Sequence, residues 1–554
     1  MKRLVKRLIA FSALAAAMAF PAAGAELTPA DDIQKALDAA APGDTIVLKD
    51  GVYYQSLNIT KGGTEGKPIT LRAAKGGAVT ISGAPPPGVL DKLVFQPYEK
   101  DVYRAAVPWE VKRPVLADSL PLYQYKSLSD MMQRTVLDRK KREQVGPEDS
   151  FRWEGGFLYV RLEGGKNPGG ARIDIARQGA DGNIRIKASD VTIEGLRLHM
   201  GITTALRGNG DRIVIRDCLA SGAQTGFSLN GDRNRLEYCE VSGPIRYEWR
   251  VKHHIREYGY GDVVKTSGSG DQRTVIRGNF IYNGFDGLQP RVSTSWVRTD
   301  WSEITGNLFM FNCDDAIELD AGKQNVLNMR VHHNLFLNNF VAFSICAVEG
   351  GHLLIDHNIV YHSPCAYPWG TIFKLGTPWN PNVPAKDWAI VHNTLVNAST
   401  RGDFKWFGEK IVDHINVLFL NNIFYATNAI GDPGLKGAVW GNNLVCNPAA
   451  TGKVPNSIAV NLGHWDPFDA RLQANSPAVD AGGPIPEPWA ERLKGITPAY
   501  RHEARGKAPD LGALELGETW KFEQPGPRWG SWKDIPSRPS FPQSFDPSWA
   551  GFRK

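Results

Sequence analysis

Two consecutive stretches decide the fold: Asn279-Phe-Ile-Tyr-Asn-Gly-Phe-Asp-Gly-Leu288 and, one repeat later, Asn307-Leu-Phe-Met-Phe-Asn-Cys-Asp-Asp-Ala-Ile317. Apolar residues recur in them with period two, which is the period of a β-strand. The leading asparagine returns at steps of 28, 27, 24, 35, 29 and 21 residues by subtraction. Its seven positions are Asn279, Asn307, Asn334, Asn358, Asn393, Asn422 and Asn443.

A repeat with a constant minimum length and a variable excess indicates one fixed coil of chain that carries loops of different sizes. Such coils bury their apolar faces only against their neighbours, as in solenoid proteins. Short strands, polar turns and stacked asparagines predict an all-β fold, a right-handed parallel β-helix. We treat the repeat asparagines as turn residues.

The ends and one internal segment depart from the repeat. Residues 1–25 combine four basic residues, an apolar run and Ala23-Gly-Ala25, which is typical of a secretory signal peptide. Residues 26–84 are expected to form an N-terminal cap, with a helix over Asp31–Ala41, and the first coils. Residues 85–180 lack the repeat pattern and predict an inserted subdomain. The β-helix with its groove is expected over 181–515, followed by an irregular Pro- and Trp-rich tail at 516–554.

Charge and composition narrow the compartment and the partners. The formal charge of +6 falls to about +2 when the four basic residues of the signal are removed. A nearly neutral chain argues against nucleic acid as a partner, and no later segment is apolar enough to span a membrane. We therefore expect a periplasmic or secreted monomer without a nucleic-acid partner; the loops rich in aromatic and basic residues, and not the charge, predict a polysaccharide or oligosaccharide substrate.

Cysteines and histidines are assigned to the structure of the stack. Cys218 and Cys239 fall at matching places in neighbouring repeats, either as reduced core thiols or as a disulfide. His333, His357 and His392 each precede a repeat asparagine. Their equal register predicts a stack at one turn and not a metal site.

The candidate catalytic residues are three aspartates on adjacent coils. Registering the two opening stretches on each other places Asp286 level with Asp315 and Gln289 level with Glu318, with Asp314 beside them. Stacked strands lie ~4.8 Å apart, so these carboxylates crowd one patch. Negative charges at that distance raise the pKa of at least one of the carboxyl groups, which is the arrangement that a general acid beside a general base needs. A calcium cluster of Asp315, Glu318 and Asp320 is the alternative.

Aromatic and basic residues in the long loops are candidate substrate-binding groups, because flat rings stack on sugars and cations meet carboxylates or sulfates. Packing of the loops onto the solenoid is the other explanation for the rings. The substrate-binding set is Trp249, Arg250, Gln289, Arg291, Trp296, Trp301, Glu318, Trp369, Lys374 and Trp379.

The repeat resembles the pectate-lyase-like superfamily of exported carbohydrate-active β-helix proteins over roughly residues 30–515. Within it, Asp286-Gly-Leu288 and Asp314-Asp315-Ala-Ile317 are similar to the motifs of polygalacturonase-type glycoside hydrolases. This resemblance implies Asp314 as the general acid and Asp286 with Asp315 as the pair that holds the attacking water.

Three functions follow from these residues. The first is a glycoside hydrolase that cleaves a glycan with paired aspartates and needs no cofactor. The second is a polysaccharide lyase or epimerase acting on uronates with calcium, in which Lys265, Lys374 or Arg250 takes the proton. The third is a non-catalytic glycan-binding protein that uses only the aromatic loops.

Overall fold

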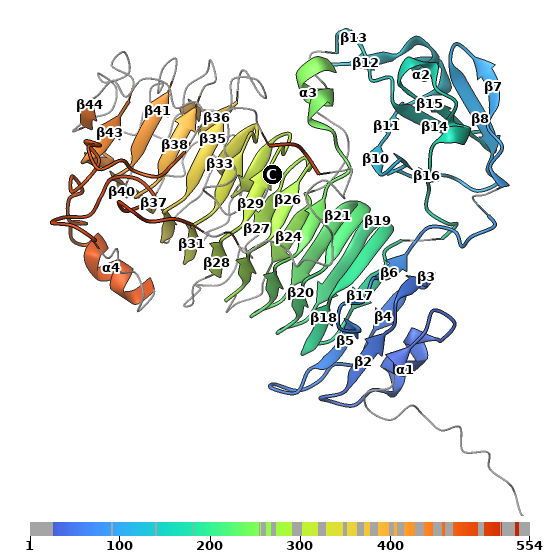
Figure 1. Ribbon diagram of the computed structural model, residues 1–554, viewed down its shortest axis with the longest axis horizontal. Coiled ribbons are helices and arrows are strands. Elements are labelled where there is room, and N and C mark those ends of the chain that lie inside the picture. Colours follow the sequence, from blue (N-terminus) through green and yellow to red (C-terminus); the bar gives the residue numbers. More distant parts are fainter. Residues whose placement is uncertain are drawn as a thin grey trace, which may run out of the picture.

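The computed structural model describes residues 26–89, 92–138, 141–179, 181–253, 255, 262–267, 273–290, 302–319, 328–346, 352–362, 370–376, 386–397, 404–406, 415–426, 437–446, 457–459, 469–496, 504–520, 522 and 538–541. Within them the chain winds into an elongated stack of coils, with a separate β-rich body beside the first coils (Figure 1). The signal-peptide prediction lies outside the described residues.

Each coil contributes to up to three parallel ladders, and the first is a 13-stranded sheet. Its strands are β1 (Glu26–Leu27), β2 (Thr45–Leu48), β5 (Ile69–Ala73), β18 (Val191–Glu194), β20 (Val214–Arg216), β22 (Arg235–Glu237), β25 (Val275–Arg277), β28 (Ser302–Thr305), β31 (Met329–His332), β34 (Leu353–Asp356), β37 (Lys386–Val391), β40 (Ile415–Leu420) and β42 (Val439–Gly441).

The second ladder pairs strands of the next face of the coil, all in parallel. Its strands are β3 (Gly51–Tyr53), β6 (Val79–Ser82), β19 (Leu196–Asn209), β21 (Leu219–Asn230), β23 (Glu240–Ser242), β26 (Phe280–Tyr282), β29 (Leu308–Met310), β32 (Leu335–Leu337), β35 (Ile359–His362), β38 (Thr394–Asn397), β41 (Ile423–Ala426), β43 (Asn443–Val445) and β44 (Ser457–Ala459).

The third ladder shares the long strands β19 and β21 with the second. Its other strands are β4 (Leu57–Ile59), β17 (Ile184–Ile186), β24 (Val264–Ser267), β27 (Leu288–Pro290), β30 (Asp315–Glu318), β33 (Val341–Cys346), β36 (Thr371–Gly376) and β39 (Phe404–Trp406). Because crossovers between parallel strands are right-handed in nearly all proteins, this is the predicted right-handed parallel β-helix.

The repeat asparagines make a continuous hydrogen-bonded ladder inside the coil. The side-chain oxygen of Asn334 accepts from the backbone N–H and the Nδ2 of Asn307, at 3.0 and 2.9 Å, and the Nδ2 of Asn334 donates to Asn358. The same pattern continues to Asn443. These amides satisfy backbone groups at a turn that lies inside the fold, where an unpaired group would be costly.

The two stacks predicted from register are also present. The rings of His333, His357 and His392 stack with centroids 5.1 and 5.3 Å apart, each on a left-handed backbone position. Cys218 and Cys239 lie buried on adjacent coils as free thiols, and the backbone N–H of Cys218 contacts the Cys239 sulfur at 3.4 Å. The reduced-thiol interpretation is therefore the one that the structure bears out.

The cap is shorter than predicted. Helix α1 spans Ile33–Ala39, and Asp32 is its N-cap, with the side chain accepting from the backbone of Lys35. The prediction of a helix from Asp31 is wrong because Thr28 and Asp31 are engaged in their own turn, in which the Asp31 carboxylate accepts from the Thr28 backbone and hydroxyl. The buried Ile33 and Leu37 pack α1 onto the first coils.

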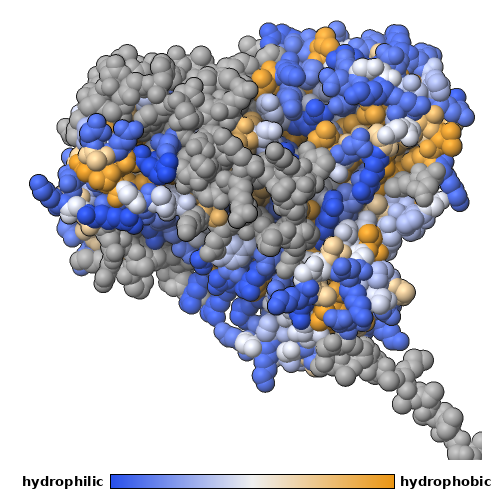
Figure 2. All heavy atoms as spheres, viewed as in Figure 1, coloured by the Kyte–Doolittle hydropathy of each residue, from blue (hydrophilic) through white to orange (hydrophobic). Residues whose placement is uncertain are grey.

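Between β6 and β17 lies the inserted subdomain, seen beside the first coils in Figure 1. It contains helix α2 (Leu128–Gln133) and short strands in three small sheets. The strands are β7 (Gln96–Glu99), β8 (Val102–Ala106), β9 (Leu116–Ala117), β10 (Leu120–Pro121), β11 (Tyr123–Gln124), β12 (Thr135–Leu137), β13 (Glu143–Val145), β14 (Ser150–Glu154), β15 (Phe157–Arg161) and β16 (Ile173–Asp174). Figure 2 shows apolar side chains on its surface, and Val94 and Val145 are exposed.

The remaining helices are α3 (Tyr247–His253), in the segment between β23 and β24, and α4 (Trp489–Ile496), near the last coils (Figure 1). Part of the tail reaches back along the stack, where the Arg538 guanidinium pairs with the fully buried Glu240 of β23. In the part of the chain that the structure describes, no helix has the length and apolar character of a membrane span.

Candidate active site

Acidic side chains gather where strands of the third ladder begin. Asp262 precedes β24, Asp286 precedes β27, and Asp314 and Asp315 mark the start of β30. Leu288 pairs with Ile317, as the repeat register predicted. Because one coil repeats above the next, residues from three turns of sequence come together at the same end of this ladder.

The register also forms a row of polar side chains along the ladder. Lys265 pairs with Gln289, Glu318 pairs with Ser344, and Ser344 pairs with Lys374. Their neighbours at alternate positions, such as Leu288, Ile317 and Phe343, belong to the interior core. Since successive side chains of a strand point to opposite faces, the polar row lies on the outer face of the third ladder. Gln289 and Glu318 are hydrogen-bonded within this row.

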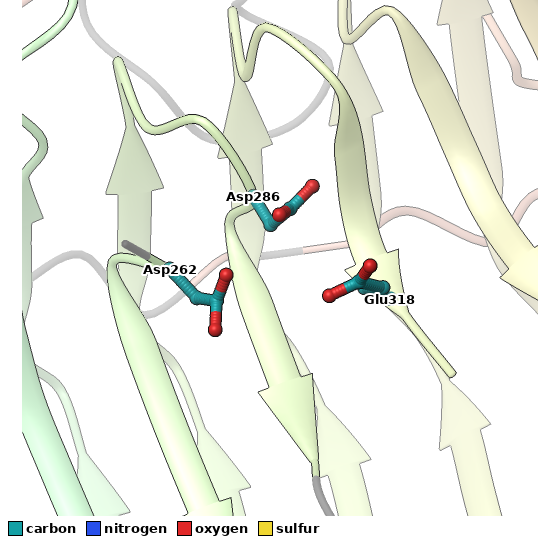
Figure 3. A group of neighbouring side chains, drawn as sticks. All are labelled: Asp262, Asp286 and Glu318. Atoms are coloured by element: carbon teal, nitrogen blue, oxygen red, sulfur yellow. The ribbon is translucent and has the colours of Figure 1, made fainter. Parts of the chain in front are cut away.

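The carboxylates form two overlapping groups that share Asp286. Oxygens of Asp262, Asp286 and Glu318 lie within 4.8 Å of one another, and the same holds for Asp286, Asp314 and Asp315. Figure 3 shows the first group, with carboxylates from three successive coils directed toward one space. Asp286 is buried, and burial followed by the neighbouring negative charges raises its pKa well above the usual range.

Two lysines bring positive charge to this cluster. The Lys374 Nζ lies 2.6 Å from Asp315 Oδ2, and the side chains of this pair are 7% and 1% exposed. Lys374 sits two strands farther along the ladder than Asp315, so its long side chain reaches back past β33. Lys265 pairs with Asp262 at 2.9 Å in a more open position.

Helix α3 supplies an arginine to the cluster. The Arg250 Nη2 lies 3.5 Å from Asp314 Oδ1, and the guanidinium carbon sits 3.7 Å from the centre of the Phe340 ring. The buried Nη1 of Arg250 has no hydrogen-bond partner among the described residues. A planar guanidinium held over an aromatic ring is well suited to meeting a carboxylate.

The inserted subdomain holds α3 in this position. The rings of Tyr123 and Trp249 meet edge to face at 5.4 Å, and Arg246 forms an ion pair with Asp149 at 2.7 Å. Trp249 is only 2% exposed. The ring packs the helix against the insert, which was the alternative explanation for the loop aromatics, and its role in substrate binding stays a prediction.

Most of the predicted site residues that the structure describes therefore lie close together. One region holds Asp286, Asp314, Asp315, Glu318, Gln289, Arg250 and Lys374, and Trp249 packs the helix that carries Arg250 against the insert. Arg291, Trp296, Trp301, Trp369, Trp379 and the alternative calcium ligand Asp320 lie outside the described residues. The catalytic roles assigned to the three aspartates stay predictions.

Sequence reasoning missed Asp262 as a member of the cluster. It follows the long segment between β23 and β24, where no repeat asparagine marks the register. The available signal was its position two residues before the valine of β24, which matches the position of Asp286 before Leu288.

The donor set fits a divalent cation such as calcium. Five carboxylates supply hard oxygen ligands, which is the chemistry that Ca²⁺ and Mg²⁺ prefer. Among the described residues, the five carboxylates exceed the three cations Lys265, Lys374 and Arg250 in number, and burial among like charges is unfavourable for Asp286. The residues that would hold the ion are either Asp286, Asp314 and Asp315 or Asp262, Asp286 and Glu318, two groups that share Asp286.

Comparison with known proteins gives matches to the first coils and to the whole stack. A family model for chondroitinase B matches residues 27–86. "Pectate lyase PEL9" from Emericella nidulans is 45% identical over 69 residues, which are 12% of this chain and 17% of the relative. "Uncharacterized protein YwoF" from Bacillus subtilis is 37% identical over 60 residues, 11% of this chain and 13% of the relative. The matches thus span less than a fifth of either relative's length.

Solved structures similar over most of the chain include "The complex structure of XylC with xylose", with a TM-score of 0.48 and 12% identity over 78% of this chain and 83% of that one. "Crystal structure of pectate lyase Pel9A" has a TM-score of 0.38 and 14% identity over 89% and 96%. "Structure of PL6 family alginate lyase AlyGC" has a TM-score of 0.42 and 15% identity over 90% and 60%.

The continuous parallel ladders and the N-terminal match agree with the predicted resemblance in fold. The chain is a right-handed parallel β-helix protein whose first coils, within residues 27–86, are similar to the chondroitinase B family.

Proposed function

We propose that this protein is a polysaccharide lyase that cleaves a uronate-containing glycan by β-elimination with the help of a divalent cation. The observation that carries the proposal is the buried Lys374, held 2.6 Å from Asp315 within the carboxylate cluster. A basic side chain fixed beside a cation-binding set is the minimum machinery that this elimination needs.

Elimination removes the proton next to the uronate carboxylate, forms a C=C double bond and breaks the glycosidic C–O bond on the adjacent carbon, whose oxygen leaves as a hydroxyl with a proton from water. The carboxylate of the substrate must first be neutralised, because its negative charge opposes formation of a carbanion-like transition state. A cation held by Asp286, Asp314 and Asp315 would supply that positive charge and, by competing for the Asp315 oxygens, would weaken the ion pair of Asp315 with Lys374.

The chain's own residues then have separate tasks. Asp315 orients the Lys374 amine, which takes the proton as general base. Arg250, stacked on Phe340, offers Nη1 to the substrate carboxylate. Gln289 fixes Glu318 through their hydrogen bond and so keeps one side of the carboxylate set in place.

The local similarity to a pectate lyase and to the chondroitinase B family supports a lyase, since those names denote cleavage of acidic polysaccharides. This replaces glycoside hydrolysis as the leading interpretation. Asp314, the expected general acid, has the Arg250 guanidinium 3.5 Å away. Export of the chain, suggested by residues 1–25, is part of the same proposal.

The test is an activity screen of the purified protein on polygalacturonate, alginate and chondroitin sulfate, with calcium or with a chelator. A lyase produces an unsaturated uronate, so ultraviolet absorbance should rise together with reducing ends, and the chelator should abolish both. Reducing ends without ultraviolet absorbance would instead establish hydrolysis. Binding to a glycan with neither product would leave the binding-protein function.

A further inference from the structure

A second set of chemically competent side chains lies where the inserted subdomain meets the β-helix. Ser221 belongs to β21, His199 to the neighbouring strand β19, and Asp174 to β16 of the insert. Ser221 and His199 are register partners in adjacent coils. None of the three takes part in the carboxylate cluster or in the proposed elimination.

The three side chains are arranged in series. The Ser221 hydroxyl lies 3.1 Å from His199 Nδ1, and His199 Nε2 lies 3.5 Å from Asp174 Oδ2. The second distance is longer than a good hydrogen bond, but catalytic hydrogen bonds are often long before substrate binds. His199 and Asp174 are 4% and 3% exposed, whereas Ser221 is partly exposed. The nucleophile is thus the member of the series nearest to solvent.

The protonation of this series suits a base. Burial lowers the pKa of His199, so the imidazole is neutral near pH 7. Burial by itself would raise the pKa of Asp174, but His199 and then Arg172, whose Nε lies 3.1 Å from Asp174 Oδ1, outweigh it and lower that pKa. A charged Asp174 facing Nε2 favours the tautomer with the proton on Nε2, which leaves Nδ1 free to accept from the Ser221 hydroxyl.

The backbone turns immediately after both residues. Met200, which follows His199, and Gly222, which follows Ser221, have φ values of 55° and 67°, and the ladder shifts register between His199 and Ile202. A Cβ on Gly222 would come within 2.6 Å of the Met200 sulfur and 3.1 Å of the Met200 backbone nitrogen, so a side chain there would force its neighbour to shift. Irregularities of this kind re-aim side chains and are enriched beside active sites.

An arginine completes the group. Arg197 lies two residues before His199 on the same face of β19, and its charge acts on both His199 and Asp174. Its buried Nε has no hydrogen-bond partner among the described residues. Positive charge beside a serine nucleophile can stabilise an oxyanion or hold an acidic sugar.

We propose that Ser221, His199 and Asp174 form a second active site, which hydrolyses acyl esters carried by the glycan. The Ser221 oxygen attacks the ester carbonyl and forms a new C–O bond while its proton passes to His199 Nδ1. The ester C–O bond breaks, and the sugar hydroxyl leaves with that proton. Water then attacks the acyl-serine by the same route, which releases the carboxylic acid and restores Ser221.

Asp174 is a positioning residue in this scheme, because it acts on the substrate only through His199. That the acyl group sits on a glycan rests on the proposed function, whereas the serine nucleophile does not. Removal of acyl groups would prepare a decorated polysaccharide for elimination at the carboxylate cluster. The two sites are separable by mutation, so failure of one leaves the other to be judged on its own.

The test uses the full-length mature protein and a fluorophosphonate probe, which labels activated serines, followed by peptide mass spectrometry. Ser221 should be labelled, and Ser221→Ala should lose labelling and lower p-nitrophenyl acetate hydrolysis by on the order of 10³-fold or more. Ser242→Ala is the matched control, because that buried serine on β23 donates to the Gly243 carbonyl and not to a histidine of the described residues. It should retain full esterase activity.

Three further measurements complete the test. Asp174→Asn should lower kcat for ester hydrolysis with KM unchanged, which the loss of a purely structural contact would not produce. Acetate should be released from acetylated polygalacturonate by the wild type and not by Ser221→Ala, with lyase activity equal in both. Absence of labelling at Ser221, or esterase activity unchanged in Ser221→Ala, would overturn the second site, and labelling without acetate release would overturn the glycan ester as its substrate.

Discussion

Replacement of Lys374 by methionine tests the proposed elimination most directly. Methionine keeps most of the side-chain volume and removes the amine that lies 2.6 Å from Asp315. If Lys374 is the general base, turnover should fall by roughly 10²- to 10⁴-fold, which corresponds to about 2.7–5.4 kcal/mol in the activation free energy at 1.36 kcal/mol per tenfold change. The assay is the rate of ultraviolet absorbance increase on the uronate polysaccharide that the screen identifies.

The free energy of unfolding has to be measured as well, because the substitution also removes the lysine that pairs with the buried Asp315 carboxylate. The Lys374 and Asp315 side chains are 7% and 1% exposed, and breaking a buried pair on one side costs about 3–5 kcal/mol. The double variant Asp315→Asn with Lys374→Met should regain much of that free energy of unfolding but none of the activity. Lys187→Met, at an exposed lysine after β17, is the matched control. Wild-type turnover in a folded Lys374→Met protein would refute the assignment.

Three further predictions concern the cluster, its arginine and the stack. Burial and neighbouring carboxylates raise the pKa of Asp286 in the folded state. Protonation of Asp286 therefore stabilises the fold at pH values below the unfolded-state pKa of about 3.9. This stabilisation is lost as the pH rises through the folded-state pKa. Urea titrations of both proteins in the presence of a chelator should therefore show that the unfolding free energy of the wild type, minus that of Asp286→Asn, declines as the pH rises. A difference that is constant with pH would contradict the raised pKa of Asp286. Arg250→Ala should lower kcat/KM by roughly 10- to 150-fold, as loss of a charge-assisted hydrogen bond costs about 1.5–3 kcal/mol, and Arg250→Lys should recover little because it cannot stack flat on Phe340. Asn334→Ala should lower the free energy of unfolding by about 1–3 kcal/mol for each buried group left unpaired, including the Asn307 N–H. In thermal unfolding, the control Asn58→Ala, at an exposed asparagine, should stay within about 0.5 kcal/mol of the wild type.

The sequence by itself determined the coil. A period-two pattern and a recurring asparagine specify a strand and a turn locally, and each coil meets only its neighbours, so local register propagates into the whole stack. That is why the pairing of Leu288 with Ile317, the stack of His333, His357 and His392, and the adjacency of Cys218 and Cys239 were all predictable. The juxtaposition of Asp286, Asp314 and Asp315 followed from the same arithmetic.

Only the tertiary structure decided what surrounds those carboxylates. Lys374 is 59 residues from Asp315 and reaches it across two coils, because loops of unequal length separate them in sequence but not in space. The insert lacks the repeat, so its contacts cannot be predicted from sequence periodicity. These contacts include the packing of Trp249 of α3 and the approach of Asp174 to His199. Local periodicity fixes contacts between neighbouring coils, whereas contacts made by inserted segments depend on packing of surfaces far apart in the chain.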